Sequence, residues 1–332
     1  MVCSRLGGLM RQSQRFAPVL IVGTLLIMGS IMGFQRLAQA SGNVHETWTH
    51  SDWLTPAEVA RWSRSPGIRD YVFRMLNPGT SELAALLQLS AASSLTIEME
   101  SLPQPGDADL WRKLARKVPL KIKLLDIPLP ATDDIQLLNS IAPHSIEFLM
   151  KHFPDIEDGE RLSAFTVPIS IEFQTPFYPR YEEKELLLAI PANVTLNFVS
   201  QIWPWYHQMD VFNMTPHAKK LKILGGTFPS GPHWDYLKNI HGLEEVAVYS
   251  DYPPPSPEVW KEFGDNRIVW VYSSGVPVES DLKAFERSSS APGSRKLIIQ
   301  TEASLPSEER ARLDQVSIPV DWKHPVPWSD AR

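Results

Sequence analysis

The stretch Leu120-Lys121-Ile122-Lys123-Leu124, followed by Ile127-Pro128, decides the fold predicted for this chain. Apolar and charged residues alternate in it with a period of two, which is typical of a β-strand with one buried face. The same unit recurs along the chain, with an apolar pair eight residues before each of the first eight of nine prolines. The prolines are 23 to 29 residues apart, most of them 25: Pro103, Pro128, Pro154, Pro179, Pro204, Pro229, Pro254, Pro277 and Pro306. A period in this range predicts a repeat architecture.

A short helix is predicted after each proline. Apolar residues there follow helical spacing, as in Trp111 and Leu114 or in Trp260 and Phe263. Acidic or small polar residues such as Asp107 open these stretches, as expected at helix N-termini. Each unit therefore predicts a strand, a proline-containing turn, a short helix and a return to the next strand.

Two architectures repeat such a unit, a closed (β/α)₈ barrel and an open solenoid. Strands of an eight-stranded barrel are buried on both faces and are therefore continuously apolar. Here Glu98, Lys121, Lys123 and Glu172 leave one strand face charged, and sealing them in a barrel would carry a large desolvation penalty. We therefore predict an open right-handed βα solenoid of about nine 25-residue repeats, with a small (β/α)₈ barrel as the alternative.

The unit resembles a divergent leucine-rich repeat over residues 93–320. The apolar strand pair matches that family's Leu-x-Leu, and the residue before each proline matches its apolar position seven after the first strand residue. The family's Asn or Cys, five after that residue, is missing, and Leu125 and Gln201 are two of the residues found instead. The resemblance implies a horseshoe with its ligand on the concave face of the sheet.

The first 40 residues predict an export signal. Arg5, Arg11 and Arg15 precede an uncharged, largely apolar run over 16–34, and Ala38-Gln39-Ala40 offers a cleavage site. The run is also long enough to remain as an N-terminal membrane anchor. Both interpretations place the rest of the chain outside the cytoplasm, in the periplasm, on a membrane or secreted.

The remaining chain divides into a helical N-terminal cap over 41–92, a solenoid over 93–315 and a C-terminal cap over 316–332 that contains a last strand. Four of the 32 basic residues lie in the first 40 positions, which leaves 28 basic and 38 acidic residues, a net charge of −10. This acidic balance argues against nucleic acid and against an anionic membrane surface as partners.

The open face of the sheet is the first candidate site. Its first half is charged, with Glu98, Lys121, Lys123, Glu147 and Glu172, which either form solvated ion pairs or orient a ligand. Its second half is predicted to expose an apolar stripe, which marks either an interaction surface or a face that the C-terminal cap covers. The stripe consists of Leu224, Tyr249, Trp270 and Tyr272.

The second candidate site is Trp205 and Tyr206, which follow Pro204 in a turn. They are predicted either to contact a sugar ring or a peptide, or to pack between adjacent turns. For other chemistry the sequence offers no pattern: it contains no H-E-x-x-H, no paired cysteines and no G-x-S-x-G. We therefore predict no catalytic residues, no metal site and no cofactor.

These features predict an exported, non-enzymatic module that binds a protein or peptide on its concave sheet face. The first alternative is a (β/α)-barrel glycoside hydrolase acting on envelope polysaccharide, in which Glu98, Glu147 and Glu172 would supply the carboxylates. The second alternative is a structural envelope protein that associates with itself through the aromatic face.

Overall fold

The computed structural model describes most of the chain after residue 43. The described ranges are 44–50, 55–63, 69–75, 77–89, 92–175, 177–224, 228–229, 232–252, 267–287, 294–301 and 305–325. They belong to the unit Val44–Arg332, and the predicted export signal lies outside them. Within these ranges no helix has both the length and the apolar character needed to cross a membrane.

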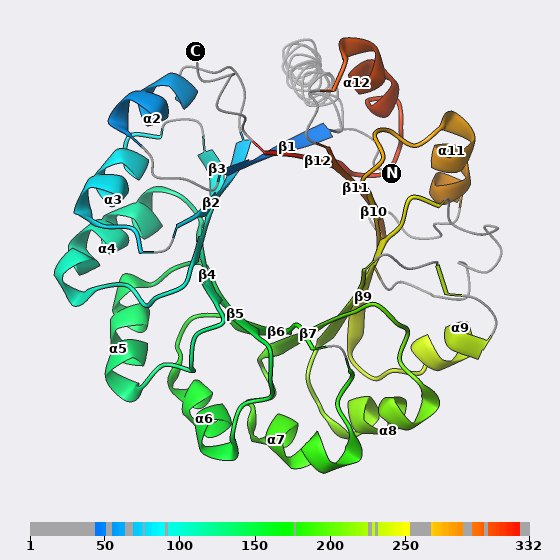
Figure 1. Ribbon diagram of the computed structural model, residues 1–332, viewed down its shortest axis with the longest axis horizontal. Coiled ribbons are helices and arrows are strands. Elements are labelled where there is room, and N and C mark those ends of the chain that lie inside the picture. Colours follow the sequence, from blue (N-terminus) through cyan, green and yellow to red (C-terminus); the bar gives the residue numbers. More distant parts are fainter. Residues whose placement is uncertain are drawn as a thin grey trace, which may run out of the picture. The chain divides into compact units, whose positions relative to one another are not determined.

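The described strands form a closed barrel of twelve parallel strands, in which each pairs with its neighbours in the chain and β12 pairs with β1 (Figure 1). The predicted open, leucine-rich-repeat-like solenoid is therefore wrong. The alternative of a βα barrel holds in its coarser form, with twelve strands in place of eight. The strands are β1 (Val44–His50), β2 (Arg69–Arg74), β3 (Ala92–Met99), β4 (Leu120–Leu125), β5 (Ser145–Met150), β6 (Ile169–Phe173), β7 (Thr195–Ser200), β8 (Lys219–Ile223), β9 (Leu243–Tyr249), β10 (Arg267–Tyr272), β11 (Arg295–Gln300) and β12 (Val320–Pro325).

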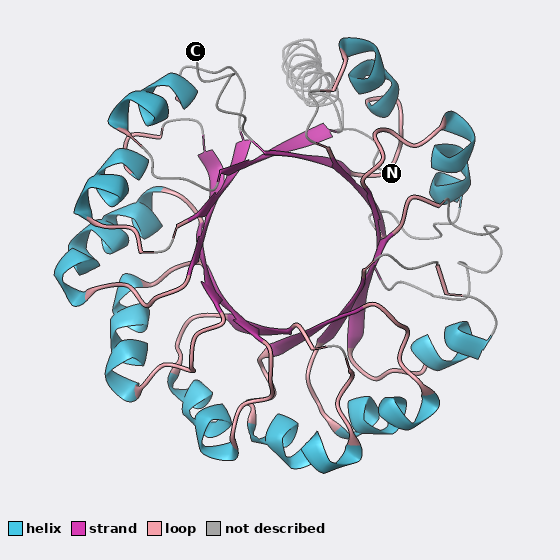
Figure 2. Ribbon diagram, in the orientation of Figure 1, coloured by secondary structure: helices cyan, strands magenta, loops and turns pink. Residues whose placement is uncertain are grey.

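Helices surround the ring of strands on its outside (Figure 2). Thr55 opens the first described helix with a capping box, in which its hydroxyl and the Glu58 carboxylate bond reciprocally to backbone N–H groups. The described helices are α2 (Pro56–Trp62), α3 (Thr80–Leu86), η1 (Pro105–Asp107), α4 (Ala108–Lys117), α5 (Thr132–Ile141), α6 (Ile156–Arg161), η2 (Leu162–Ala164), η3 (Tyr181–Glu183), α7 (Lys184–Ala189), α8 (Tyr206–Met214), α9 (Pro232–Leu237), α11 (Glu279–Arg287) and α12 (Ser307–Leu313).

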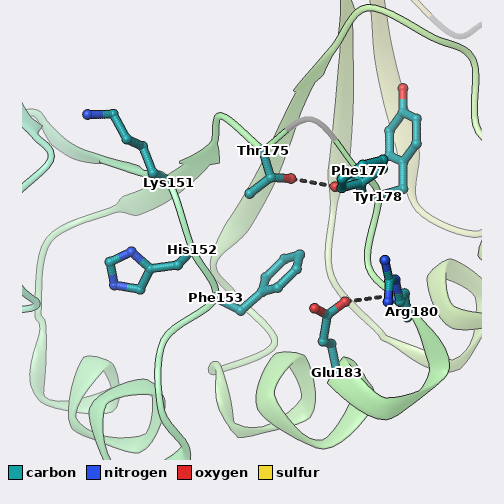
Figure 3. A pocket seen from close by; sticks show the side chains of 8 residues that line it. All are labelled: Lys151, His152, Phe153, Thr175, Phe177, Tyr178, Arg180 and Glu183. Atoms are coloured by element: carbon teal, nitrogen blue, oxygen red, sulfur yellow. Dashed lines mark hydrogen bonds between the residues drawn. The ribbon is translucent and has the colours of Figure 1, made fainter.

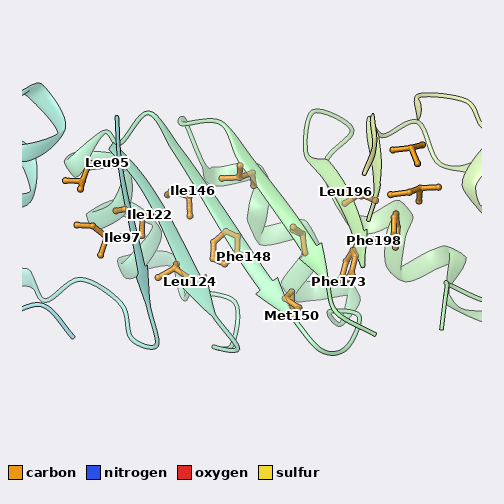
Figure 4. Packing of buried hydrophobic residues seen from close by; sticks show 14 of the residues in the cluster. Leu95, Ile97, Ile122, Leu124, Ile146, Phe148, Met150, Phe173, Leu196 and Phe198 are labelled. Carbon is orange, nitrogen blue, oxygen red and sulfur yellow. The ribbon is translucent and has the colours of Figure 1, made fainter. Parts of the chain in front are cut away.

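The hydrophobic core lies between the strands and the helices (Figure 4). Alternate strand residues, such as Ile122 and Leu124 of β4, are fully buried there with Trp111 of α4 and Leu138 of α5. The predicted apolar pairs form this helix-facing layer from β3 to β9. The residues between them, Lys121 and its equivalents, therefore point into the barrel.

Residues 44–92, predicted as a helical cap, instead hold β1, α2, β2 and α3. They supply two further βα units, and β1 fills the position between β2 and β12. Caps protect the exposed core at the ends of an open solenoid. A closed ring has no ends to cover, which explains why these residues continue the βα pattern.

Strand β10 faces the opposite way from the prediction. Trp270 is fully buried on the helix side, where its ring contacts Phe228 and Phe285 edge-on and its indole N–H donates to the Ser250 carbonyl at 2.9 Å. Tyr272 packs against the same core. Ile268 through Val271 are all apolar, so an alternation of period two cannot indicate which face of the strand points to the helices. In the structure Trp270, the largest of these side chains, lies on the helix side.

Truncating Trp270 to alanine should lower the free energy of unfolding by about 4 kcal/mol, because it empties a fully buried ring site. Chemical denaturation followed by circular dichroism measures this change. The matched control is Tyr252→Ala, since Tyr252 is 70% exposed at the turn after β9, and its effect should stay within about 0.5 kcal/mol. Equal stability of the two variants would contradict the register of β10.

Candidate functional site in the barrel lumen

The inner face of the barrel, here called the lumen, carries charged side chains that keep some contact with water. Twelve strands about 4.8 Å apart and tilted by about 40° close into a ring about 24 Å across, whereas eight strands would give about 16 Å. The side chains of Lys123, Lys222 and Lys121 remain 17, 24 and 39% exposed. The number of strands therefore leaves room for charges that a narrower barrel would have to desolvate completely.

Lys123 of β4 lies at the centre of an ion-pair network in the lumen. Its Nζ is 4.0 Å from Glu98, 3.9 Å from Glu147 and 3.7 Å from Glu172, which come from β3, β5 and β6. The side chains of Glu147 and Glu172 are only 4 and 3% exposed. Three carboxylates from three neighbouring strands thus share one ammonium group, as their inward position in consecutive strands allows.

Further bonds complete the pairing of these carboxylates. Lys121 forms a close ion pair with Glu147, and Lys222 of β8 forms another with Glu172. Gln174 Nε2 also donates to Glu172 Oε1 at 2.9 Å, and Arg74 lies 3.3 Å from Glu98. Every carboxylate on this wall of the lumen is therefore matched by a cation.

The lysines keep Glu147 ionised. Burial alone would raise the pKa of Glu147, but the ammonium groups of Lys121, Lys123 and Lys222 outweigh it and lower the pKa to about 2. A buried carboxylate is stable in its charged form only with such partners. At neutral pH this group can accept hydrogen bonds but has no proton to donate.

Lys323 of β12 differs from the other lumen lysines. Within the described part of the chain its side chain makes no hydrogen bond, and no carboxylate lies within 4 Å of it, whereas Lys296 of β11 pairs closely with Asp321. Burial lowers the pKa of Lys323, and Lys222, Lys296 and Lys123 lower it further, against the opposite effect of Asp321. Lysines of four strands therefore repel one another across the lumen.

A second wall of the lumen is apolar. Ala247 of β9 packs with Val269 and Val271 of β10, and Tyr249 and Ile298 lie against this small cluster. Burial raises the pKa of the Tyr249 hydroxyl. Because this cluster is separate from the helix-facing core, its apolar surface belongs to the lumen.

The structure brings together only some of the predicted site residues. Glu98, Lys121, Lys123, Glu147 and Glu172 form the charged network, and Tyr249 joins the apolar wall. The predicted stripe is not continuous: Trp270 and Tyr272 lie on the helix side, and Leu224 is 38% exposed at the end of β8. Trp205 is 58% exposed in the turn between β7 and α8, and Tyr206, the first residue of α8, is 64% exposed.

The sequence analysis missed Lys222, Lys296, Asp321 and Lys323 as site residues. Strand β12 carried a usable signal, since the buried Val320 and Trp322 alternate with Asp321 and Lys323. Among the residues that the structure describes, no three or more His, Cys, Asp or Glu side chains are placed to hold a metal ion.

Replacing Glu147 by glutamine should lower the free energy of unfolding by about 2 kcal/mol, since it removes the charge of a nearly buried carboxylate and leaves the partly exposed Lys121 and Lys123 with one counter-charge fewer. Urea denaturation at pH 7 measures the loss. The matched control is Glu279→Gln, because Glu279 is exposed and pairs with Lys283 on the surface of α11, and little change is expected there.

The same variant gives a pH test. With a folded pKa near 2 and an ordinary value of 4.5, Glu147 contributes stability that is present above pH 4.5 and is lost as the pH falls towards 2. The parent protein should therefore lose stability more steeply than Glu147→Gln across this window. Parallel pH profiles would show that the lysines do not hold this carboxylate ionised.

Comparison with known proteins provides no relative from which a function could be taken. No protein-family model matches the chain, and no curated protein matches it significantly. What the lumen can do follows from its own geometry and charges.

Proposed function

We propose that this chain is a binding protein that holds a small organic anion in the lumen of its barrel. Lys323 is the observation that carries the proposal: its inward-facing ammonium group has no carboxylate within 4 Å among the described residues, and Lys222, Lys296 and Lys123 all lower its pKa. An ammonium group in a confined site is costly without a counter-charge. A ligand carboxylate or phosphate would supply that charge.

The charges of the network support an anion as the missing component. The set contains five lysines and four carboxylates, and each of the four carboxylates already lies within 4 Å of a cation. The cation in excess is therefore on the Lys323 side. The set consists of Glu98, Lys121, Lys123, Glu147, Glu172, Lys222, Lys296, Asp321 and Lys323.

The apolar wall indicates what the anionic group is attached to. Ala247, Val269 and Val271 offer small, buried apolar surfaces on β9 and β10, and Lys296 and Lys323 stand on the following strands β11 and β12. Apolar walls with a few placed polar groups are typical of small-molecule sites. The lumen thus favours an amphiphilic ligand with an apolar body and an acidic head.

Because the barrel is closed, a ligand of its inner sheet face must be smaller than the predicted protein ligand. A concave face within a ring about 24 Å across between backbones, and less between side chains, excludes a folded protein domain. The expected non-enzymatic binding role is retained in our proposal, with a small molecule in place of a macromolecule.

The glycoside hydrolase alternative draws on one specific observation. Glu147 and Glu172 lie 3.9 and 3.7 Å from the same Lys123 ammonium, so two carboxylates face one point of the lumen, as that chemistry requires. Such enzymes need one carboxylic acid that is protonated at the working pH. The pKa of about 2 leaves Glu147 ionised, and Lys222 engages Glu172, which favours binding over hydrolysis.

The predicted self-association surface lacks its central residue, because Trp270 is not exposed. Trp270 was the largest residue of the aromatic face, and it is fully buried against α11. This favours the lumen over the outer aromatic face as the functional site.

Titration calorimetry with decanoate and decyl phosphate tests the proposal, with decanol as the neutral control. We expect at least one of the two anions to bind with a Kd below 1 mM and Lys323→Met to weaken it at least tenfold, on the order of 1.4 kcal/mol. Lys113→Met is the matched control, since Lys113 is exposed on α4. Because Lys323 is repelled by its neighbours, its replacement should also raise the melting temperature.

Three outcomes would overturn the proposal. These are the absence of binding for both anions, equal binding of decanol, and unchanged affinity in Lys323→Met. Turnover of a cell-wall glycan that Glu147→Gln abolishes would instead establish the hydrolase.

A further inference from the structure

A cavity lies at the edge of the barrel where β5 and β6 end (Figure 3). Its volume is about 390 Å³, and the turns after these two strands line it with Lys151, His152, Phe153, Phe177 and Arg180 among others. This volume lies in the range of small-molecule sites. The carboxyl-end edge is also the side on which βα barrels carry their functional loops.

The cavity presents one cation, Arg180, whose guanidinium has no carboxylate partner among the described residues, and one carboxylate, Glu183. Arg180 uses its backbone N–H to donate to Glu183, while its guanidinium lies 5.9 Å from the centre of the Phe177 ring and makes no hydrogen bond or ion pair with the described residues. His152 also lines the cavity and is exposed, but it lies on the opposite side of Phe153 from Arg180 (Figure 3). Lys151 pairs with Asp126 outside the cavity. The guanidinium N–H groups of Arg180 can therefore donate to an acidic group that enters the cavity.

Exposed aromatic rings continue from the cavity along the same edge. Phe177, in the turn after β6, is 59% exposed, and Tyr181, the first residue of η3, is 63% exposed. Trp205 and Tyr206 are similarly exposed after β7. The Tyr178 hydroxyl donates to the Ile202 carbonyl at 2.9 Å and so holds these two turns together. Large rings exposed on adjacent turns usually mark an interaction site.

We propose that this edge binds an acidic polysaccharide, independently of the lumen. The net charge of −10 over residues 41–332 opposes a polyanion at long range but is screened by salt, so the contact depends on the local Arg180 guanidinium and on the exposed aromatic rings. The carboxylate of one uronic acid residue would bind the Arg180 guanidinium in the cavity. The next sugar rings would stack on Tyr181, Trp205 and Tyr206. The edge thus becomes an extended glycan site of several subsites, with the charged one at the cavity.

The arrangement of the rings favours a glycan over a peptide. The twelve described strands are all paired on both sides, so none of them can accept a peptide by strand addition. The rings stand on separate turns and lie among polar side chains such as His207 and Arg180. A sugar ring offers an apolar C–H face and hydroxyl edges, which match isolated aromatic faces with polar neighbours.

Binding of a hexamer of galacturonic acid, measured by titration calorimetry and by tryptophan fluorescence, tests this inference. Its neutral control is the carboxyl-reduced hexamer. We expect the acidic hexamer to bind with a Kd below 1 mM and the neutral one at least tenfold more weakly. Arg180→Gln should weaken binding at least tenfold and Trp205→Ala at least fivefold, whereas Arg116→Gln, on the exposed side of α4, should change nothing.

Each contrary result has a distinct meaning. No binding of the hexamer, or equal binding of both hexamers, overturns the inference. Tighter binding of hexaglutamate than of the sugar assigns the edge to acidic peptides instead. Binding that Lys323→Met abolishes while Arg180→Gln leaves it intact would place the sugar in the lumen. Retained hexamer binding alongside a failed decanoate titration would leave this inference standing without the lumen proposal.

Discussion

The pairing of β1 with β12 is the constraint on which the rest of the structure depends. Val44 through Thr49 lie in parallel register with Val320 through Pro325, and this ladder converts a row of βα units into a ring. Closure removes both edge strands and with them the need for caps. It also encloses the inner sheet face, so that side chains which would line an open groove face one another across a lumen.

The charged lumen shows why the sequence predicted the strands correctly but not the closure. Leu120-Lys121-Ile122-Lys123-Leu124 gives both the strand and its helix-facing side, and Ile122 and Leu124 are fully buried as expected. The inference of an open arc rested on the cost of desolvating Lys121 and Lys123 in a barrel of eight strands. Twelve strands widen the ring, and neighbouring carboxylates match the lysines, so that cost is largely avoided. The strand count depends on β1 and β2, whose sequences lack the proline period.

The site could be predicted only where period-two alternation is unambiguous. Glu98, Glu147 and Glu172 alternate with apolar residues and were found, whereas Trp270 stands in a run of apolar residues that fits either face. Convergence between distant strands is not encoded in any local pattern. That Lys222 and Lys323, about a hundred residues apart, repel each other follows only from closure of the ring.

The two proposed sites follow from one property of a closed βα ring. The strands and helices already pair the backbone hydrogen-bonding groups and bury the repeated apolar pairs. Side chains that the fold does not need can therefore be recognised. Among the described residues, Lys323 has no carboxylate within 4 Å inside the ring, and large aromatic side chains that follow β6 and β7 are exposed outside it. Natural proteins break local rules of stability mainly where function requires it. Both departures can be relieved by an acidic ligand, an amphiphilic anion in the lumen and a uronic acid at the edge. The closed ring limits the lumen to small ligands, whereas the exposed edge can bind several residues of a polysaccharide.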